Sequence, residues 1–96
     1  MSRAELIKIL RLLNEETRQK YKGRIIGLFG SYARGEQNEA SDVDLLIEKE
    51  ECLSLFALGG MKIFLEERLN KKVDIVTTSA LRKEIEPHIM SELVYI

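Results

Sequence analysis

The first twenty residues repeat apolar side chains at helical spacing, with charged residues on the opposite side. Ser2 and Glu5 stand three positions apart, which is the spacing of a capping box at the start of a helix. We therefore expect a first helix over residues 3–20, ending near Lys22-Gly23. Its expected buried side is Leu6, Ile9, Leu10, Leu13 and Thr17.

Three later segments are short and apolar, and polar or glycine-containing stretches bound them, which is typical of strands. They are Arg24–Phe29, Asp42–Glu48 and Lys72–Thr77. Helical spacing returns between the second and third strands, over Leu53–Leu69. After the third strand, Thr78-Ser79 is expected to cap a helical turn over Ala80–Glu84, and Pro87 suits the first turn of a last helix reaching about Tyr95.

This order of elements predicts the α/β (α+β) fold class. We expect a small mixed sheet of three strands flanked by about four helices. The 96 residues contain no repeat, linker or low-complexity tract, and the length is typical of a single hydrophobic core. The sequence therefore predicts one domain over residues 1–96.

Composition narrows the classes of function. Apolar residues make up 45% and charged residues 32%, as in ordinary folded proteins, and the net charge of −1 supplies no broad basic field for long nucleic acid. Glu5 interrupts the N-terminus before any signal-like apolar run, and no stretch is long enough to span a membrane. We therefore expect a cytoplasmic protein without a membrane partner. Cys52, the single cysteine, is expected to be a small buried side chain.

Residues 30–45, GSYARGEQNEASDVDL, hold the candidate chemistry. Side chains alternate across a strand, so Asp42 and Asp44 share a face, about 6.6 Å apart along the backbone. In KVDIVT, Asp74 lies on the opposite face of its strand from Val73 and Ile75. It can therefore lie near Asp42 and Asp44 if the two strands are neighbours, at about 4.8 Å. Three clustered carboxylates repel one another, and their oxygen ligands favour Mg²⁺ or Mn²⁺ over zinc.

Gly30 and Ser31 precede the carboxylates at the end of a strand. Glycine allows close approach of a phosphate to the backbone, and serine adds a hydroxyl and an amide donor. The stretch is no Walker A loop, because its second glycine, Gly35, is not followed by Lys-Ser or Lys-Thr. A phosphate cradle facing metal-binding carboxylates indicates metal-assisted phosphoryl or nucleotidyl transfer.

Gly30-Ser31, ten intervening residues, Asp42-x-Asp44 and a later Asp74 resemble the minimal nucleotidyltransferase family of the DNA polymerase β-like superfamily. The resemblance implies that Asp42 and Asp44 bind two Mg²⁺ ions carrying a nucleoside triphosphate. It implies that Gly30 and Ser31 hold the β- and γ-phosphates. It also implies that Asp74 binds the metal on the nucleophile side and serves as base.

The resemblance assigns no single role to Tyr32 and Arg34, which follow Ser31. Arg34 either touches phosphate or forms a salt bridge within the loop, and Tyr32 stands where relatives often carry a basic or small residue. The plainer alternative for Asp42 and Asp44 is that both face solvent. His88 is expected to be a surface residue, while Leu93, Val94 and Ile96 fit either the core or an exposed interface.

The chain has no room for an acceptor-binding domain, so another macromolecule is expected to bring the acceptor. Members of this family are typically encoded with a HEPN-domain ribonuclease toxin. The resemblance implies transfer of AMP from ATP to a tyrosine of that toxin. Two alternatives stay open: an antitoxin that only binds and occludes its partner, and transfer to RNA or a small acceptor, which the near-neutral charge disfavours.

Overall fold

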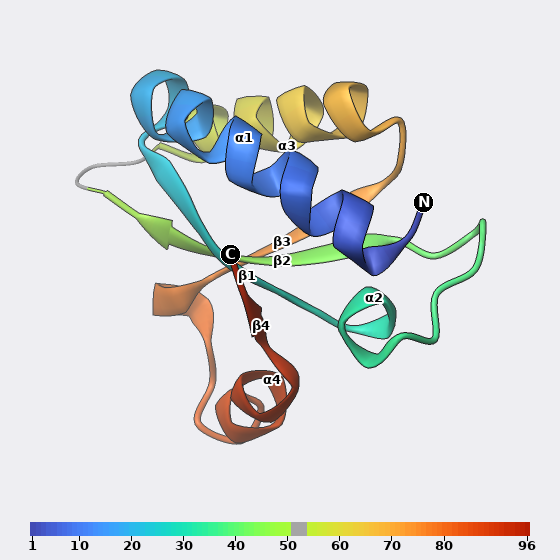
Figure 1. The fold of residues 1–96 in the computed structure, drawn as a ribbon. Coiled ribbons are helices and arrows are strands. Elements are labelled where there is room, and N and C mark those ends of the chain that lie inside the picture. The colour runs from blue at the N-terminus through green and yellow to red at the C-terminus, as the bar shows by residue number, and fades with distance from the viewer. Residues whose placement is uncertain (51–53) are drawn as a thin grey trace.

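A computed structural model, which describes residues 1–50 and 54–96, shows one mixed sheet with helices on both sides (Figure 1). Helices α1 (Arg3–Tyr21) and α3 (Leu55–Leu69) lie side by side over one face of the sheet. The short helix α4 (Glu86–Glu92) lies on the other side. This arrangement confirms the α/β class.

The sheet has the strand order β3-β2-β1-β4. Parallel pairing joins β2 and β3, and antiparallel pairing joins β1 to both β2 and β4, so the sheet is mixed as expected. The strands are β1 (Gly23–Phe29), β2 (Val43–Lys49), β3 (Val73–Thr77) and β4 (Val94–Tyr95). The three strands expected from the sequence are present, and β4 is an addition.

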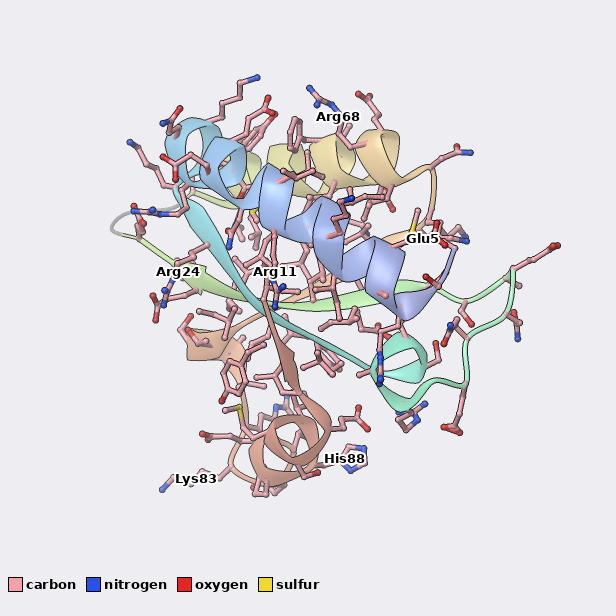
Figure 2. All side chains as sticks on the ribbon, viewed as in Figure 1. Glu5, Arg11, Arg24, Arg68, Lys83 and His88 are labelled. Carbon is pink, nitrogen blue, oxygen red and sulfur yellow. The ribbon has the colours of Figure 1, made fainter. Side chains whose placement is uncertain are left out.

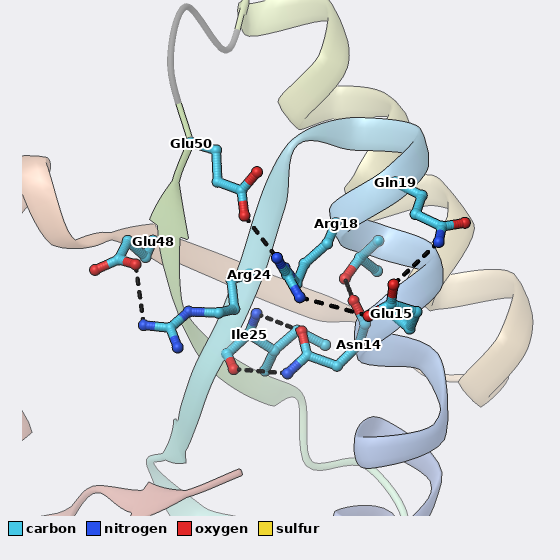
Figure 3. A network of polar contacts seen from close by, with 9 residues as sticks. Asn14, Glu15, Arg18, Gln19, Arg24, Ile25, Glu48 and Glu50 are labelled. Carbon is cyan, nitrogen blue, oxygen red and sulfur yellow. Dashed lines mark hydrogen bonds and ion pairs between the residues drawn. The ribbon is translucent and has the colours of Figure 1, made fainter.

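The first helix forms as its apolar spacing and cap predict. The Ser2 side chain accepts a hydrogen bond from the Glu5 amide at 3.1 Å. Directly after α1, Lys22 adopts a left-handed conformation with φ of 58° and caps the end of the helix. The Asn14 side chain forms two hydrogen bonds with the backbone of Ile25 in β1, accepting from its amide at 2.9 Å and donating to its carbonyl at 3.1 Å (Figure 3). These two bonds fix α1 against the sheet.

The core lies between the helical pair and the sheet. Alternate residues of β2 point into it, which leaves the intervening positions of that strand facing the opposite side. The β2 side chains in this core are Val43, Leu45 and Ile47. The core residues from α1 and α3 are Leu6, Leu10, Leu13, Met61, Phe64, Leu65 and Leu69.

The end of the chain differs from the expected helix. Helix α4 stops at Glu92, and the next residues turn into β4, whose Val94 pairs with Leu28 of β1. Gly27 makes this possible, since a Cβ there would lie 2.7 Å from Leu93 Cδ1 and 2.8 Å from the Val94 carbonyl oxygen. The prediction of a helix to Tyr95 was therefore wrong, and the apolar end is strand. Of the three apolar residues for which core and exposed interface were the alternatives, Val94 and Ile96 pack against the core, and all three, Leu93 included, are partly buried.

The segment after β3 also differs. A 3-10 turn, η1 (Thr78–Ala80), comes first, and the Glu86 amide then donates to the Arg82 carbonyl at 2.8 Å in a separate turn. The bounds predicted for a helical turn, Ala80–Glu84, were therefore wrong. The Ser79 hydroxyl lies 3.3 Å from the Thr77 hydroxyl and belongs to the turn itself instead of capping a later helix. Helix α3 begins at Leu55, capped by Ser54, whose side chain accepts from the Ala57 amide at 3.0 Å. Cys52 and Leu53 lie outside the described residues.

His88 is exposed on α4, as expected for a surface histidine, and Figure 2 shows it pointing away from the sheet. Along residues 1–50 and 54–96, no helix combines the length and the apolar character needed to cross a bilayer.

Candidate functional site

The parallel pairing of β2 and β3 brings two of the predicted carboxylates side by side. Asp44 and Asp74 are direct partners in the register of the two strands. Asp42 lies immediately before β2 and two residues from Asp44, so alternation places it towards the same face. The three residues predicted from the sequence therefore all lie at the start of β2 and β3.

Asp44 is the most enclosed of the three, because Asp42 and Asp74 are exposed. Burial, followed by the negative charges of Asp74 and Asp42, raises the pKa of Asp44 to about 6. A bound cation would relieve this repulsion, and carboxylate oxygens are the ligands that Mg²⁺ and Mn²⁺ prefer. The donor set therefore fits a divalent cation.

The carboxylates are not gathered into a ready-made cage. Within the part of the chain that the structure describes, no three His, Cys, Asp or Glu side chains stand close enough together to hold a metal ion. The exposed side chains of Asp42 and Asp74 are not confined by burial. Cation binding would therefore draw them towards Asp44.

Gly30 ends β1 beside Asp44, and its backbone explains why glycine stands there. Its φ of 76° and ψ of −153° lie in a region that is essentially restricted to glycine. A Cβ at this position would also overlap the carboxylate of Asp44. Close approach at Gly30 is thus required by Asp44 itself, in addition to the phosphate role that the resemblance implies.

A short helix, α2 (Ser31–Arg34), follows Gly30 and holds the turn together. The Arg34 amide donates to the Gly30 carbonyl at 3.1 Å, and the Glu36 amide donates to the Ser31 carbonyl at 2.9 Å. Tyr32 is only 1% exposed and belongs to the core, so its side chain anchors α2 under the turn. Ser31 is partly exposed beside Gly30.

Arg34 forms salt bridges, which was one of the two roles expected for it from the sequence. Its guanidinium lies 2.6 Å from Glu36 and 3.1 Å from Glu92, and these bonds raise its pKa. Arg34 therefore stays charged and is held at the turn, and 44% of its side chain is exposed. The remaining N–H groups of a guanidinium in this position are suited to a phosphate oxygen.

Glu92 of α4 is a site residue that the sequence reasoning missed. One carboxylate oxygen accepts from the Gly30 amide at 2.9 Å and the other from Arg34 at 3.1 Å. Burial alone would raise the pKa of Glu92, but the Gly30 amide and the Arg34 guanidinium together hold it below its ordinary value. A single glutamate near the end of a chain has no local pattern that marks it, since its partners lie 62 and 58 positions away.

Comparison with known proteins agrees with this geometry. Residues 10–96 match the family model of the nucleotidyltransferase domain. The protein adenylyltransferase MntA of Thermococcus cleftensis is 40% identical over 92 residues, covering 96% of this chain and 93% of that protein.

Two solved structures share the fold. One, assigned as a minimal nucleotidyltransferase, superposes with a TM-score of 0.84 at 29% identity and covers 100% of this chain and 97% of that one. The other is a toxin–antitoxin crystal structure with AMP-PNP, with a TM-score of 0.67, 26% identity, and coverage of 86% of this chain and 72% of that one. The chain belongs to the nucleotidyltransferase domain family and is an enzyme of the nucleotidyltransferase type.

Proposed function

We propose that this chain is an Mg²⁺-dependent protein adenylyltransferase that acts as an antitoxin. It transfers AMP from ATP to a tyrosine hydroxyl of a HEPN-domain ribonuclease toxin. The observation that carries the proposal is the register of Asp44 with Asp74 beside the Gly30 turn. The similarity to MntA and to a toxin–antitoxin structure containing AMP-PNP supports the protein acceptor and the nucleotide.

The proposal gives each part of the site a task. Asp42, Asp44 and Asp74 would hold the cations, which neutralise the triphosphate and the charge that develops at the α-phosphorus. The Ser31 hydroxyl and amide and the guanidinium of Arg34 would orient the β- and γ-phosphates. Gly30 leaves the room that the Asp44 carboxylate occupies.

The reaction is a displacement at the α-phosphorus. The tyrosine oxygen forms a bond to that phosphorus, the bond to the β-phosphate oxygen breaks, and pyrophosphate leaves with the bonding electrons. Asp74 is exposed near the start of β3 and would accept the proton of the tyrosine hydroxyl. In-line geometry is consistent with phosphates held at the Gly30 turn and the acceptor approaching from the side of β3.

The competing account is an antitoxin that neutralises its partner by binding alone. The double variant Asp42→Asn/Asp44→Asn separates the two accounts, because it removes the cation ligands and leaves most of the surface unchanged. In cells producing the proposed HEPN-domain toxin partner, we expect the variant to form the complex and to lose the ability to restore growth. A matched control, Glu15→Gln/Glu67→Gln, removes two exposed charges from the outer surfaces of α1 and α3 and should neutralise fully.

Full neutralisation by Asp42→Asn/Asp44→Asn, with complex formation intact, would contradict the catalytic proposal and establish the binding account. If the variant loses both complex formation and neutralisation, the transfer of labelled AMP to the partner has to be measured directly in vitro.

A further inference from the structure

The outer edge of β3 is open in the described part of the chain. The sheet order places β3 at one end, with β2 on its inner side. The Val43 amide donates to the Lys72 carbonyl at 2.9 Å, so by alternation the main-chain groups of Val73 and Ile75 face away from β2. An exposed strand edge of this kind is a template for pairing with another segment.

The structure protects the first outward amide but not the next outward position. The Val73 amide donates to the side chain of Glu66 at 3.0 Å. Among the described residues, no hydrogen bond outside the β2–β3 ladder uses the amide or the carbonyl of Ile75. The open position of β3 is therefore one residue beyond Asp74.

Apolar side chains flank this open position and form a groove. Two adjoining hollows of about 500 and 440 Å³ share Leu55, Leu58, Ile75 and Val76 in their linings. Leu81 and Ile85 continue the first hollow beyond η1, and Asp74 lines the second. We call this continuous hollow the β3 groove. It runs from the carboxylate site to the segment after β3.

The rim of the β3 groove is basic. Lys49, Lys62 and Arg82 belong to its lining, and Asp74 is its acidic member. None of the ion pairs among the described residues includes these three basic side chains. Leu55 is 87% exposed and Phe56 is 93% exposed at the same end of α3. An occupant with apolar and acidic side chains would match both features.

From these observations we propose that the β3 groove binds an extended segment of the acceptor protein. The segment adds a strand to β3 through the main-chain groups of Ile75, and its apolar side chains pack between α3 and the segment after η1. Acidic side chains of the segment pair with Lys49, Lys62 and Arg82. The acceptor hydroxyl then lies at the Asp74 end of the groove. This inference rests on the proposed function for the identity of the acceptor.

Charge argues against a second copy of this chain as the occupant. Two copies joined through their β3 edges would bring two basic rims together, and like charges at an interface oppose binding. A partner segment that adds a strand gains main-chain hydrogen bonds for affinity, and its side chains fill pockets for specificity.

The test compares two apolar residues of the same helix. Leu55 is 87% exposed and lines both hollows, whereas Ile63 is 58% exposed and lines neither. Leu55→Asp should weaken binding of the proposed HEPN-domain partner by at least about tenfold, as loss of a central apolar contact does. Its thermal midpoint and its affinity for Mg-ATP should match those of the wild type. Ile63→Asp should bind the partner normally.

A second variant tests the charge. Lys62→Glu should weaken the same complex, and added salt should weaken the variant complex less than it weakens the wild-type complex, because one attractive charge contact has been removed. Equal partner affinity for wild type and Leu55→Asp, or equal loss in Ile63→Asp, would overturn the groove as a docking site. Altered self-association in Leu55→Asp, with normal partner binding, would assign the groove to a second copy and also overturn the proposal.

The outcome for the groove is separable from that for the proposed function. If wild type binds the partner without transferring AMP, and Leu55→Asp alone loses binding, the groove stands and the catalytic proposal fails. If wild type and Leu55→Asp bind and transfer AMP equally, the catalytic proposal stands and the groove fails.

Discussion

At the scale of single residues, the site depends on Gly30 and Asp44 sharing one small space. The glycine conformation has φ of 76° and ψ of −153°, and the missing side chain leaves room for the Asp44 carboxylate. That carboxylate is in turn the one whose pKa rises to about 6 through burial and its acidic neighbours. The two positions are therefore constrained together by packing and by charge.

Gly30→Ala should be strongly destabilising, because alanine brings both backbone strain and overlap with Asp44. We expect a loss of about 2–3 kcal/mol in the free energy of unfolding, from strain and a forced shift of the carboxylate. Gly35→Ala is the matched control, with φ of 74° and no atom within 4 Å of its added Cβ. Urea unfolding of both variants measures the difference, and equal losses would show that Asp44 does not occupy the space beside Gly30.

Asp44→Asn tests the charge in the metal-free protein. The folded-state pKa of Asp44, about 6, lies above the ordinary value of 3.8, so the folded protein favours the protonated carboxyl. The stabilising contribution of Asp44 is therefore fully present below about pH 4 and is lost as the pH rises through about 6. Asparagine carries no charge, so the variant should be more stable than wild type at about pH 7.5, by about 1 kcal/mol after allowing for solvent screening. That gain should vanish near about pH 4.

Urea unfolding at the two pH values, with a chelator present, measures the effect, and the exposed Glu67→Gln serves as control. A gain that is the same at both pH values would mean that the Asp44 charge is not its cause.

The sequence predicted those candidate site residues that a local pattern marks. Asp42, Asp44 and Asp74 follow from alternation along strands, and Gly30-Ser31 from their position at a strand end. Glu92 did not, because its hydrogen bond to Gly30 and its ion pair with Arg34 exist only after α4 folds back across the sheet. A carboxylate that binds an amide far away along the chain leaves no periodicity to read.

At the scale of elements, the amphipathic helix α1 and the strands β1 to β3 were predictable, since each buries one regular face. The chain end was not. Val94 and Tyr95 continue an apolar stretch that fits a helix equally well, and only the pairing with β1 at Gly27 and Leu28 selects the strand. The tight approach at Gly27 depends on tertiary structure that the local pattern does not contain.

Glu92 connects α4 to the Gly30 turn, so its removal should loosen one element from another. Glu92→Ala leaves the Gly30 amide without this acceptor and should cost about 1–2 kcal/mol of unfolding free energy. Glu36→Ala removes the other carboxylate that contacts Arg34, at a side chain that is 61% exposed, and should cost less than about 0.5 kcal/mol. Chemical unfolding of both variants provides the comparison. A loss in Glu36→Ala as large as that in Glu92→Ala would place the stabilisation in the Arg34 ion pairs instead of the α4 contact.

At the scale of the whole molecule, the sheet separates two approaches to one group of carboxylates. The Gly30 turn lies at the end of β1 and the β3 groove at the opposite side of β2. A nucleotide held at the turn and a protein segment held at the groove would meet at Asp44 and Asp74, which are register partners between them. Under these two proposals, the division would give a chain of 96 residues a separate place for each substrate.

The most direct measurement is which part of ATP reaches the partner protein. The proposed HEPN-domain partner would be purified and incubated with Mg²⁺, this chain and ATP labelled either at the α-phosphate or at the γ-phosphate, with Asp42→Asn/Asp44→Asn in parallel. The account predicts that α-label alone becomes attached to the partner and that the double variant attaches none. Attachment of γ-label, or a partner that stays unlabelled while wild type binds it, would contradict transfer of AMP.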